Sequence, residues 1–346
     1  MKTIRITILT AFCLFLYSCA SGSYAAPPSE IPDFYRNDKL LSSVWENDKL
    51  VIDWQTTLAE EEKVTTVFNN SPTVSFQMGG QTFLRVDGLL GSAEEINSYI
   101  TELITHYHSD HISLAVVKQC LREGSFDRLV GPYPLLEESR NNVFYELDGN
   151  KLTNSLQKDH ILDVAFDKEP LNLRFGVIGD FYYSCFDIAE NVKVELFKYQ
   201  KPHNQNTDGL IYRISHKGVS YLLFGDFDNP AGIENLLDAA MSVEAERENK
   251  LFSTLKADVV KWPHHAHKFN QRFDDLVIKM NAIIDPYFIV WERHHTQEGF
   301  REYIRRFEFN NKFLCSDDFE INFISLEMLN ARRLLRVAIS PCEVFS

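Results

Sequence analysis

The apolar and polar positions along the chain predict a mixed α/β fold. Runs rich in β-branched and aromatic residues predict strands at 63–68, 73–76, 82–87, 96–105, 192–199, 209–215, 219–224, 257–262, 283–291 and 319–325. Apolar residues recur at helical spacing in 111–122, 231–255 and 296–307. Because strands occur both early and late with helices between them, we expect a layered α/β sandwich.

Two segments depart from this pattern. Residues 27–63 mix charge with apolar residues at helical spacing, so they predict a helical lead-in before a main domain at 64–346. Residues 132–170 are polar and punctuated by proline and glycine, which predicts an insertion or lid. The helical spacing of the lead-in depends on four residues: Leu40, Leu41, Val44 and Trp45.

The first 26 residues predict an export signal and a tether. A basic start at 1–5 precedes an apolar run at 6–17, which is too short to span a bilayer comfortably. Residues 16–19 (LYSC) resemble the lipobox of bacterial lipoproteins, in which the cysteine is lipidated. Residues 23–25 (SYA) offer the small-x-small pattern of ordinary signal cleavage instead.

We favour the lipobox, and a buried N-terminal helix is the least favoured alternative. Either cleavage predicts an exported protein of the periplasm or cell envelope. Lipidation of Cys19 would anchor it to the membrane. No later run in the sequence is apolar for long enough to cross a bilayer.

Composition places the chain among globular proteins. Its 346 residues are 45% hydrophobic and 24% charged, which excludes a disordered, collagen-like or disulfide-knot protein. A net charge of −14 opposes contact with phosphate backbones, so a nucleic-acid partner is not expected. Four cysteines lie beyond the signal: Cys120, Cys185, Cys315 and Cys342. They form no Cys-x-x-Cys pair and hence no zinc ribbon, and the sequence does not decide whether they form disulfides or remain free thiols.

The most informative stretch is His-Tyr-His-Ser-Asp-His at residues 106–111, directly after a predicted strand. Imidazole nitrogens and carboxylate oxygens are the usual ligands of zinc and similar ions. His106 and His108, two positions apart on a loop, can point at one ion. Asp110 and His111 are displaced by two to three positions and can face a second ion. The motif therefore predicts a metal pair.

With its later landmarks, the chain resembles the metallo-β-lactamase superfamily, specifically the branch of competence proteins. Residues 201–204 (KPHN) follow a strand, 221–226 (YLLFGD) end a strand in Gly-Asp, and 257–265 (ADVVKWPHH) resemble the strand and His-His signature of that branch. Asp87 matches the upstream aspartate of the family. The resemblance covers roughly residues 64–325 and implies a four-layer αββα sandwich with a metal site along one edge.

The resemblance also implies a role for each residue of the site. Two divalent ions are expected, with zinc as the default and manganese or iron as alternatives. His203 would complete the first metal site, which holds His106 and His108. Asp226 would bridge both ions. The second site would hold Asp110, His111 and one histidine of the pair His264 and His265, of which we expect His265.

The same resemblance implies an exported hydrolase in which a hydroxide bridging the metals attacks the substrate. Asp110 would orient that hydroxide, and His264 would protonate the leaving group or contact the oxyanion. The His-His branch favours a phosphodiester, either a small molecule or an envelope-derived group. A lactone or carboxylic-ester hydrolase and a non-catalytic metal-binding lipoprotein are the alternatives. Ala266 departs from the glycine of the branch, and His294 and His295 are candidates for substrate contact.

Overall fold

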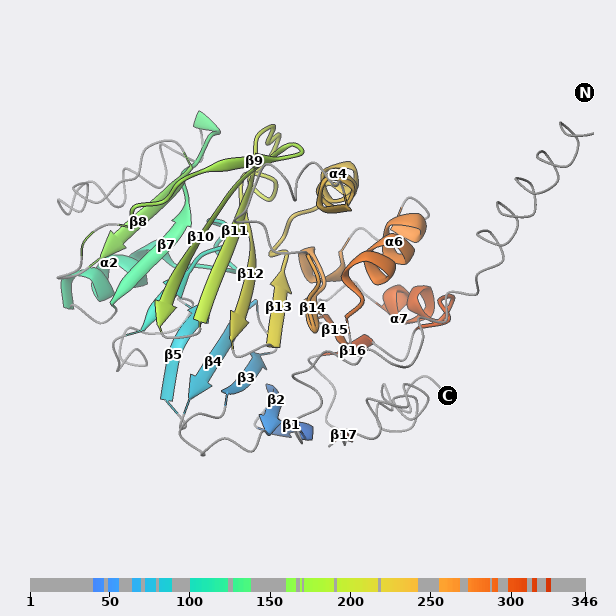
Figure 1. Ribbon diagram of the computed structural model, residues 1–346. Helices are drawn as coiled ribbons and strands as arrows, with labels where there is room; N and C mark the ends of the chain where they lie inside the picture. Colours follow the sequence, from blue (N-terminus) through green and yellow to red (C-terminus); the bar gives the residue numbers. More distant parts are fainter. Residues whose placement is uncertain are drawn as a thin grey trace, which may run out of the picture. The chain divides into compact units, whose positions relative to one another are not determined.

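Two β-sheets and a few helices make up the part of the chain that the computed structural model describes, all of it within a unit of residues 38–346 (Figure 1). The structure describes residues 40–46, 49–55, 64–69, 72–78, 81–88, 100–123, 127–137, 160–165, 169, 171–189, 192–216, 219–241, 255–267, 273–286, 288–291, 298–309, 313–315 and 322–324. The expected signal at 1–26 and the histidines at 294 and 295 lie outside these residues. Among the described helices, none combines the length and apolar character that crossing a membrane requires.

The first sheet has the strand order β17-β1-β2-β3-β4-β5-β6-β7-β8. Its strands are β1 (Leu40–Glu46), β2 (Lys49–Gln55), β3 (Val64–Asn69), β4 (Val74–Met78), β5 (Gln81–Val86), β6 (Thr101–Leu103), β7 (Arg128–Pro132), β8 (Ile161–Ala165) and β17 (Asn322–Ile324). The pairs β5–β6 and β6–β7 are parallel and the others are antiparallel. The sheet is therefore mixed.

The second sheet is also mixed and has the order β16-β15-β14-β13-β12-β11-β10-β9. Its strands are β9 (Gly176–Ile178), β10 (Phe181–Ala189), β11 (Val192–Tyr199), β12 (Leu210–His216), β13 (Val219–Leu223), β14 (Val259–Lys261), β15 (Phe288–Trp291) and β16 (Phe313–Cys315). Strands β9 to β13 pair antiparallel, and β13 to β16 pair parallel. The parallel strands require crossover connections, and helices supply them.

The two sheets contact each other through buried side chains of β3, β4 and β13. The Thr66 hydroxyl donates to the Tyr221 hydroxyl at 2.7 Å, and the rings of Phe76 and Tyr221 meet edge to face with centroids 5.0 Å apart. Thr66 and Tyr221 are both fully buried. This buried contact between strands that are distant in sequence holds the two sheets together as layers.

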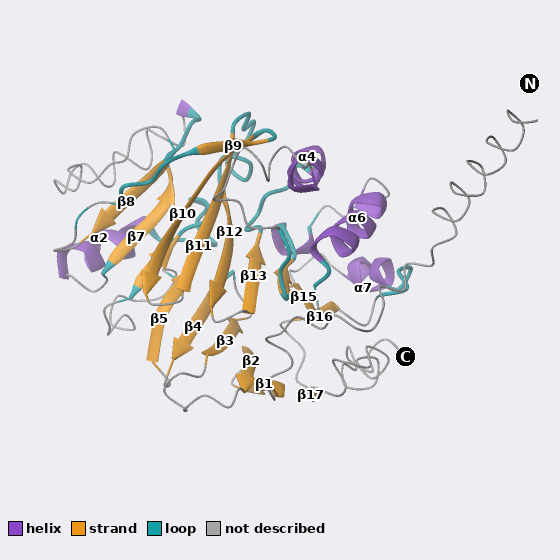
Figure 2. Cartoon of the chain, in the orientation of Figure 1, coloured by secondary structure: helices purple, strands orange, loops and turns teal. Residues whose placement is uncertain are grey.

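Helices cover the outer sides of these sheets (Figure 2). Helix α2 (Leu114–Glu123) contributes Val117 and Cys120 to an apolar cluster with β7 and β8 of the first sheet. Helices α4 (Pro230–Met241), α6 (Asp274–Ile284) and α7 (Glu298–Ile304) contribute to a larger cluster with the second sheet. The fold is thus mixed α/β, with helices on the outer sides of two stacked sheets, as expected for a sandwich.

The predicted helical lead-in is wrong where the structure describes it, because residues 40–46 and 49–55 form strands β1 and β2. Four apolar residues at helical spacing were too few to decide between helix and strand. The register pairs Glu46 with Lys49, so only Asn47 and Asp48 join the strands, and such residues favour tight turns. Pairing with β17 on the other side gives β1 backbone hydrogen bonds along both edges.

Several other predicted elements agree with the structure in type but differ in length. Strands at 192–199, 209–215 and 219–224 correspond to β11, β12 and β13, whereas the expected strand at 96–105 shortens to β6. The strand expected at 283–291 begins only at Phe288, because Ile283 and Ile284 end α6. Helix α6 and strands β8 to β10 were not predicted. Part of the predicted insertion belongs to the first sheet as β8, and 138–159 lies outside the described residues.

Candidate metal centre

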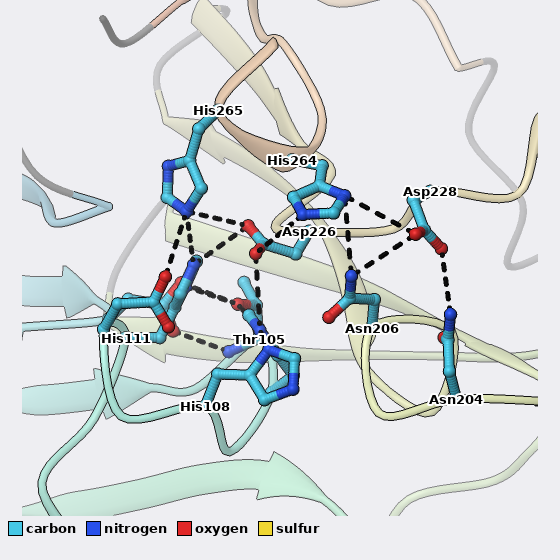
Figure 3. Close-up of polar contacts among 12 residues, drawn as sticks. Thr105, His108, His111, Asn204, Asn206, Asp226, Asp228, His264 and His265 are labelled. Carbon is cyan, nitrogen blue, oxygen red and sulfur yellow. Dashed lines mark hydrogen bonds and ion pairs between the residues drawn. The ribbon is translucent and has the colours of Figure 1, made fainter. Parts of the chain in front are cut away.

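The candidate site forms where loops leave parallel strands of both sheets (Figure 3). Strands β5 and β6 are parallel in the first sheet, and β13 and β14 are parallel in the second. Because parallel strands place their carboxyl ends at the same edge, the loops that follow them converge. These loops carry Asp87, His106, His108, Asp110, His111, Asp226, His264 and His265.

A first group of potential metal ligands comprises His106, His108 and Asp226. His106 Nε2 lies 3.0 Å from His108 Nδ1 and 3.6 Å from Asp226 Oδ2. His106 is buried and His108 is half-buried. The structure therefore brings these two histidines together beside one oxygen of Asp226.

A second group comprises Asp110, His111, Asp226 and His265. His111 Nε2 lies 2.9 Å from Asp226 Oδ1 and 3.1 Å from His265 Nε2. His265 Nε2 lies 3.3 Å from the same Asp226 oxygen and 3.5 Å from Asp110 Oδ2. All except Asp110 are buried, so this group is open to solvent at one side only.

Asp226 belongs to both groups and presents a different carboxylate oxygen to each. The strand β13 ends just before it, and Gly225 makes the turn with φ of 54°. A Cβ at Gly225 would lie 2.6 Å from the Cβ of Thr105, so the close approach of the two loops requires glycine. In the Gly-Asp sequence, the glycine is thus explained by the space available, and the aspartate by its place between the two ligand groups.

Asp87 holds the loop that follows β6 in place through polar contacts with Thr105 and His111. Its Oδ1 accepts the Thr105 N–H at 2.8 Å, and its Oδ2 accepts the Thr105 hydroxyl at 2.6 Å. Oδ2 also lies 2.9 Å from His111 Nδ1, which leaves Nε2 of that ring facing Asp226. A carboxylate at one imidazole nitrogen fixes the tautomer and directs the other nitrogen to a metal. Asp87 is 2% exposed, as this supporting role requires.

Histidines 264 and 265 lie in a turn with unusual backbone geometry. His264, His265 and Ala266 have φ of 50°, 46° and 55°, a region that side chains with a Cβ rarely adopt. The turn sends the two imidazoles in different directions, with ring centroids 6.3 Å apart. Ala266 therefore occupies a conformation that glycine adopts more easily, which accounts physically for the glycine of the resembled pattern.

The electrostatics of the cluster favour a bound cation. Burial and the neighbouring His111 hold the pKa of His106 well below its ordinary value. Burial would also lower the pKa of His111, but the carboxylates of Asp87 and Asp226 raise it to about 9. Although burial would raise the pKa of Asp226, hydrogen bonds from His111 and His265 hold it well below its ordinary value. Asp226 thus stabilises a proton on His111. A bound metal ion would supply the same positive charge in place of that proton.

Neither ligand group contains His203. The side chain is exposed, and its backbone N–H donates to the Thr207 hydroxyl at 3.0 Å. It lies instead on the wall of a pocket of about 710 Å³, lined by His108, Leu136, Glu137, His203, Asn204, Gln205 and Asn206. His203 shares this pocket with His108, and its expected place as a third ligand of the first metal site stays a prediction. Its loop follows β11, whereas the loops with the other ligands follow parallel strands.

The sequence favours His265 over His264 as the metal ligand, and of the two only His265 belongs to a ligand group. Its Nε2 lies 3.9 Å from Asp226 Oδ2, and its Nδ1 lies 3.5 Å from Asp228 Oδ2. Asp228 was not singled out, although it follows Asp226 by two residues in Gly-Asp-Phe-Asp, a spacing that could have drawn attention. Thr105 was also missed, because its role depends on a carboxylate 18 residues away.

Comparison with known proteins gives no assignment. No family model matches the chain, and no curated protein sequence matches it. A function for the chain is therefore inferred from the arrangement of its own residues.

Proposed function

We propose that this chain is a dinuclear-metal hydrolase with the metallo-β-lactamase fold. The observation that carries the proposal is the Asp226 carboxylate, whose two oxygens face two separate groups of ligands. A carboxylate shared in this way suits two ions about 3.5–4 Å apart. Stacked mixed sheets with outer helices support the same fold.

The ligand atoms fit divalent ions of the zinc type. Two nitrogens bound to one zinc ion at about 2.0–2.1 Å lie about 3.3 Å apart at a tetrahedral angle. The separations of 3.0 Å between His106 and His108 and 3.1 Å between His111 and His265 are close to this value. Imidazole with carboxylate suits zinc, and manganese or iron(II) would accept the same atoms.

His106 and His108 would hold one ion, and His111, His265 and Asp110 the other, with Asp226 between them. Two such ions supply an activated water at neutral pH and stabilise charge on oxygen. Asp110 is suited to orient this water, because its side chain is 52% exposed and still lies 3.5 Å from His265 Nε2. His264, whose Nε2 lies near Oδ2 of Asp226, is suited to contact the leaving group.

A phosphodiester is the substrate that the surroundings support best. A lactone or carboxylic-ester hydrolase would call for a more apolar pocket. Of the described residues that line the adjoining pocket, only Leu136 is apolar, and the others offer imidazole, carboxamide or carboxylate groups. Polar walls suit the oxygens and head groups of a diester. An export signal would place this activity in the cell envelope.

The test combines metal analysis with a substrate panel. Protein purified without chelators or a histidine tag should carry close to two transition metals per chain and hydrolyse bis(4-nitrophenyl) phosphate more efficiently than lactones. Asp226→Ala should lower kcat at least ~100-fold, because it removes the group shared by both ions. The matched control is Asp238→Ala. Asp238 lies on α4 and its side chain is 60% exposed, so this variant should keep full activity.

Two outcomes would contradict the proposal. Full turnover in Asp226→Ala would exclude this carboxylate from the chemistry. A folded wild-type chain that binds one ion or none after addition of zinc or manganese would favour a non-catalytic binding protein.

A further inference from the structure

A second polar cluster lies beside the candidate metal centre and contains no residue of either ligand group. It consists of Asn204, Asn206, Asp228 and His264 (Figure 3). Asp228 comes from the loop between β13 and α4, and the two asparagines come from the loop between β11 and β12. Three separate loops therefore meet at one carboxylate.

Asp228 is the centre of this cluster. Its side chain is only 3% exposed. Oδ1 faces the Asn204 amide nitrogen at 3.4 Å, while Oδ2 faces the Asn206 amide nitrogen at 3.4 Å and His264 Nδ1 at 3.5 Å. These separations are at the long end of hydrogen bonding, as is common for catalytic pairs before substrate binds. A buried carboxylate surrounded by donors in this way has a fixed orientation.

The position of Asp228 determines how the His264 ring can lie. An imidazole that donates its Nδ1–H to a carboxylate presents Nε2 on its opposite side. For His264 that side faces Asp226, whose Oδ2 lies 3.9 Å from Nε2. The backbone N–H of His264 also donates to the Gly225 carbonyl at 2.9 Å, so the backbone of this residue is held against the loop that carries Asp226.

The relation between Asp228 and His264 repeats that between Asp87 and His111. In both pairs a buried aspartate faces Nδ1, and Nε2 points at one oxygen of Asp226. The difference is that His111 belongs to a ligand group, whereas His264 stands outside both groups and is 17% exposed. Nε2 of His264 therefore points at the candidate metal centre, although His264 belongs to neither ligand group.

We propose that Asp228 is a positioning residue, which holds His264 so that Nε2 contacts the leaving-group oxygen of the substrate. This inference rests on the proposed hydrolysis of a phosphodiester. As the oxygen of a water that has already lost one proton adds to phosphorus, the scissile phosphorus–oxygen bond breaks. The departing oxygen takes the Nε2 proton of the doubly protonated His264 ring, which is left neutral with its Nδ1–H directed at Asp228. Asn204 and Asn206 hold Asp228 in place, and Asn206 Nδ2 also lies 3.5 Å from His264 Nδ1, on the side of the ring away from the reacting atoms.

The kinetic test uses metal-loaded wild type, Asp228→Asn, His264→Gln and the double variant. The substrates are aryl methyl phosphates whose leaving group varies from 4-nitrophenol to phenol. Because 4-nitrophenolate departs without help, Asp228→Asn should change its kcat less than ~5-fold, yet lower kcat for the phenyl ester ~100-fold with little change in KM. The double variant should be no slower than His264→Gln alone, because both changes act through one ring.

The matched control is Asp258→Asn. Asp258 is another buried aspartate near β13, and it accepts the Ser220 N–H at 2.7 Å away from the cluster. This variant should retain activity on every ester. Equal losses of Asp228→Asn on both esters, or multiplicative losses in the double variant, would overturn the positioning role.

A second measurement decides the question even if no diester is hydrolysed. In nitrogen-15 spectra of histidine-labelled, zinc-loaded protein, the neutral form of His264 should carry its proton on Nδ1, and Asp228→Ala should remove that preference while metal content stays unchanged. If wild type is inactive but its neutral ring shows this tautomer, the proposed function fails and the orientation of the ring by Asp228 stands. A neutral ring protonated on Nε2 in the wild type would overturn the positioning whatever the activity.

Discussion

Asp87 shows how one side chain outside the ligand set can decide the geometry of the candidate centre. Its backbone has φ of 53°, a conformation that aspartate and asparagine tolerate better than other residues with a Cβ. Through two oxygens it orders both the loop at Thr105 and the ring of His111. The sequence placed Asp87 correctly at the end of a strand, but nothing in the sequence could specify that it reaches these two residues.

We expect Asp87→Asn to weaken metal binding about 10–100-fold, because the amide can no longer accept hydrogen bonds at both of its terminal atoms. Loss of the buried contacts should also lower the free energy of unfolding by about 1–3 kcal/mol. Metal retention measured by competition with a chromogenic chelator, alongside urea unfolding, checks both.

The matched control for this change is Asp285→Asn. Asp285 also has a left-handed backbone, with φ of 51°, and it ends α6. Asparagine suits that conformation equally well, so metal retention should be unchanged. Equal loss of metal in both variants would show that the effect comes from an aspartate-to-asparagine change as such and not from the lost contacts of Asp87.

At the scale of elements, a buried ion pair connects β11 to the loops around it. Lys198 Nζ lies 2.5 Å from Asp208 Oδ1, and this carboxylate also accepts the backbone N–H groups of Leu135 and Leu136. Burial lowers the pKa of Lys198 to about 8, although Asp208 opposes the shift. The nearby Tyr107, whose pKa burial and Asp208 raise well above its ordinary value, stays neutral.

This pair predicts a pH dependence of stability. Between pH 8 and the ordinary lysine pKa of about 10.4, the unfolded chain holds a proton that folded Lys198 has released. The contribution of Lys198 to the free energy of unfolding therefore rises with pH, by at most about 1.4 kcal/mol per unit. Urea unfolding should show this rise in wild type relative to a Lys198→Met, Asp208→Asn double variant. Parallel curves for the two proteins would contradict the lowered pKa.

The elements also show what the sequence could and could not predict. Strands such as β11 and β13 are rich in β-branched, aromatic and other apolar residues, and this composition predicts their type. Strands β1 and β2 were missed because their pairing with each other and with β17 outweighs a short helical spacing. Likewise, the order of the site histidines is a property of the sequence, but which of them come within ligand distance of one another depends on how their loops fold.

At the scale of the whole molecule, the candidate centre joins the two sheets. His106 and His111 follow a strand of the first sheet, and Asp226 and His265 follow strands of the second. A cation held between such ligands would add a connection that the unfolded chain cannot make, because they are up to 159 positions apart in sequence. Binding to the folded state alone stabilises it by mass action.

We therefore expect stability to depend on metal across the whole molecule. Zinc at a hundredfold excess over its Kd should add about 2.7 kcal/mol to the free energy of unfolding. For a chain of this size, that corresponds to a rise in Tm of roughly 4 °C. Thermal unfolding of chelator-stripped and zinc-loaded protein measures the shift. In Asp226→Ala most of the shift should disappear, since that variant lacks the carboxylate common to both groups. Identical unfolding of stripped and loaded wild type would mean that no ion bridges the two sheets at this position.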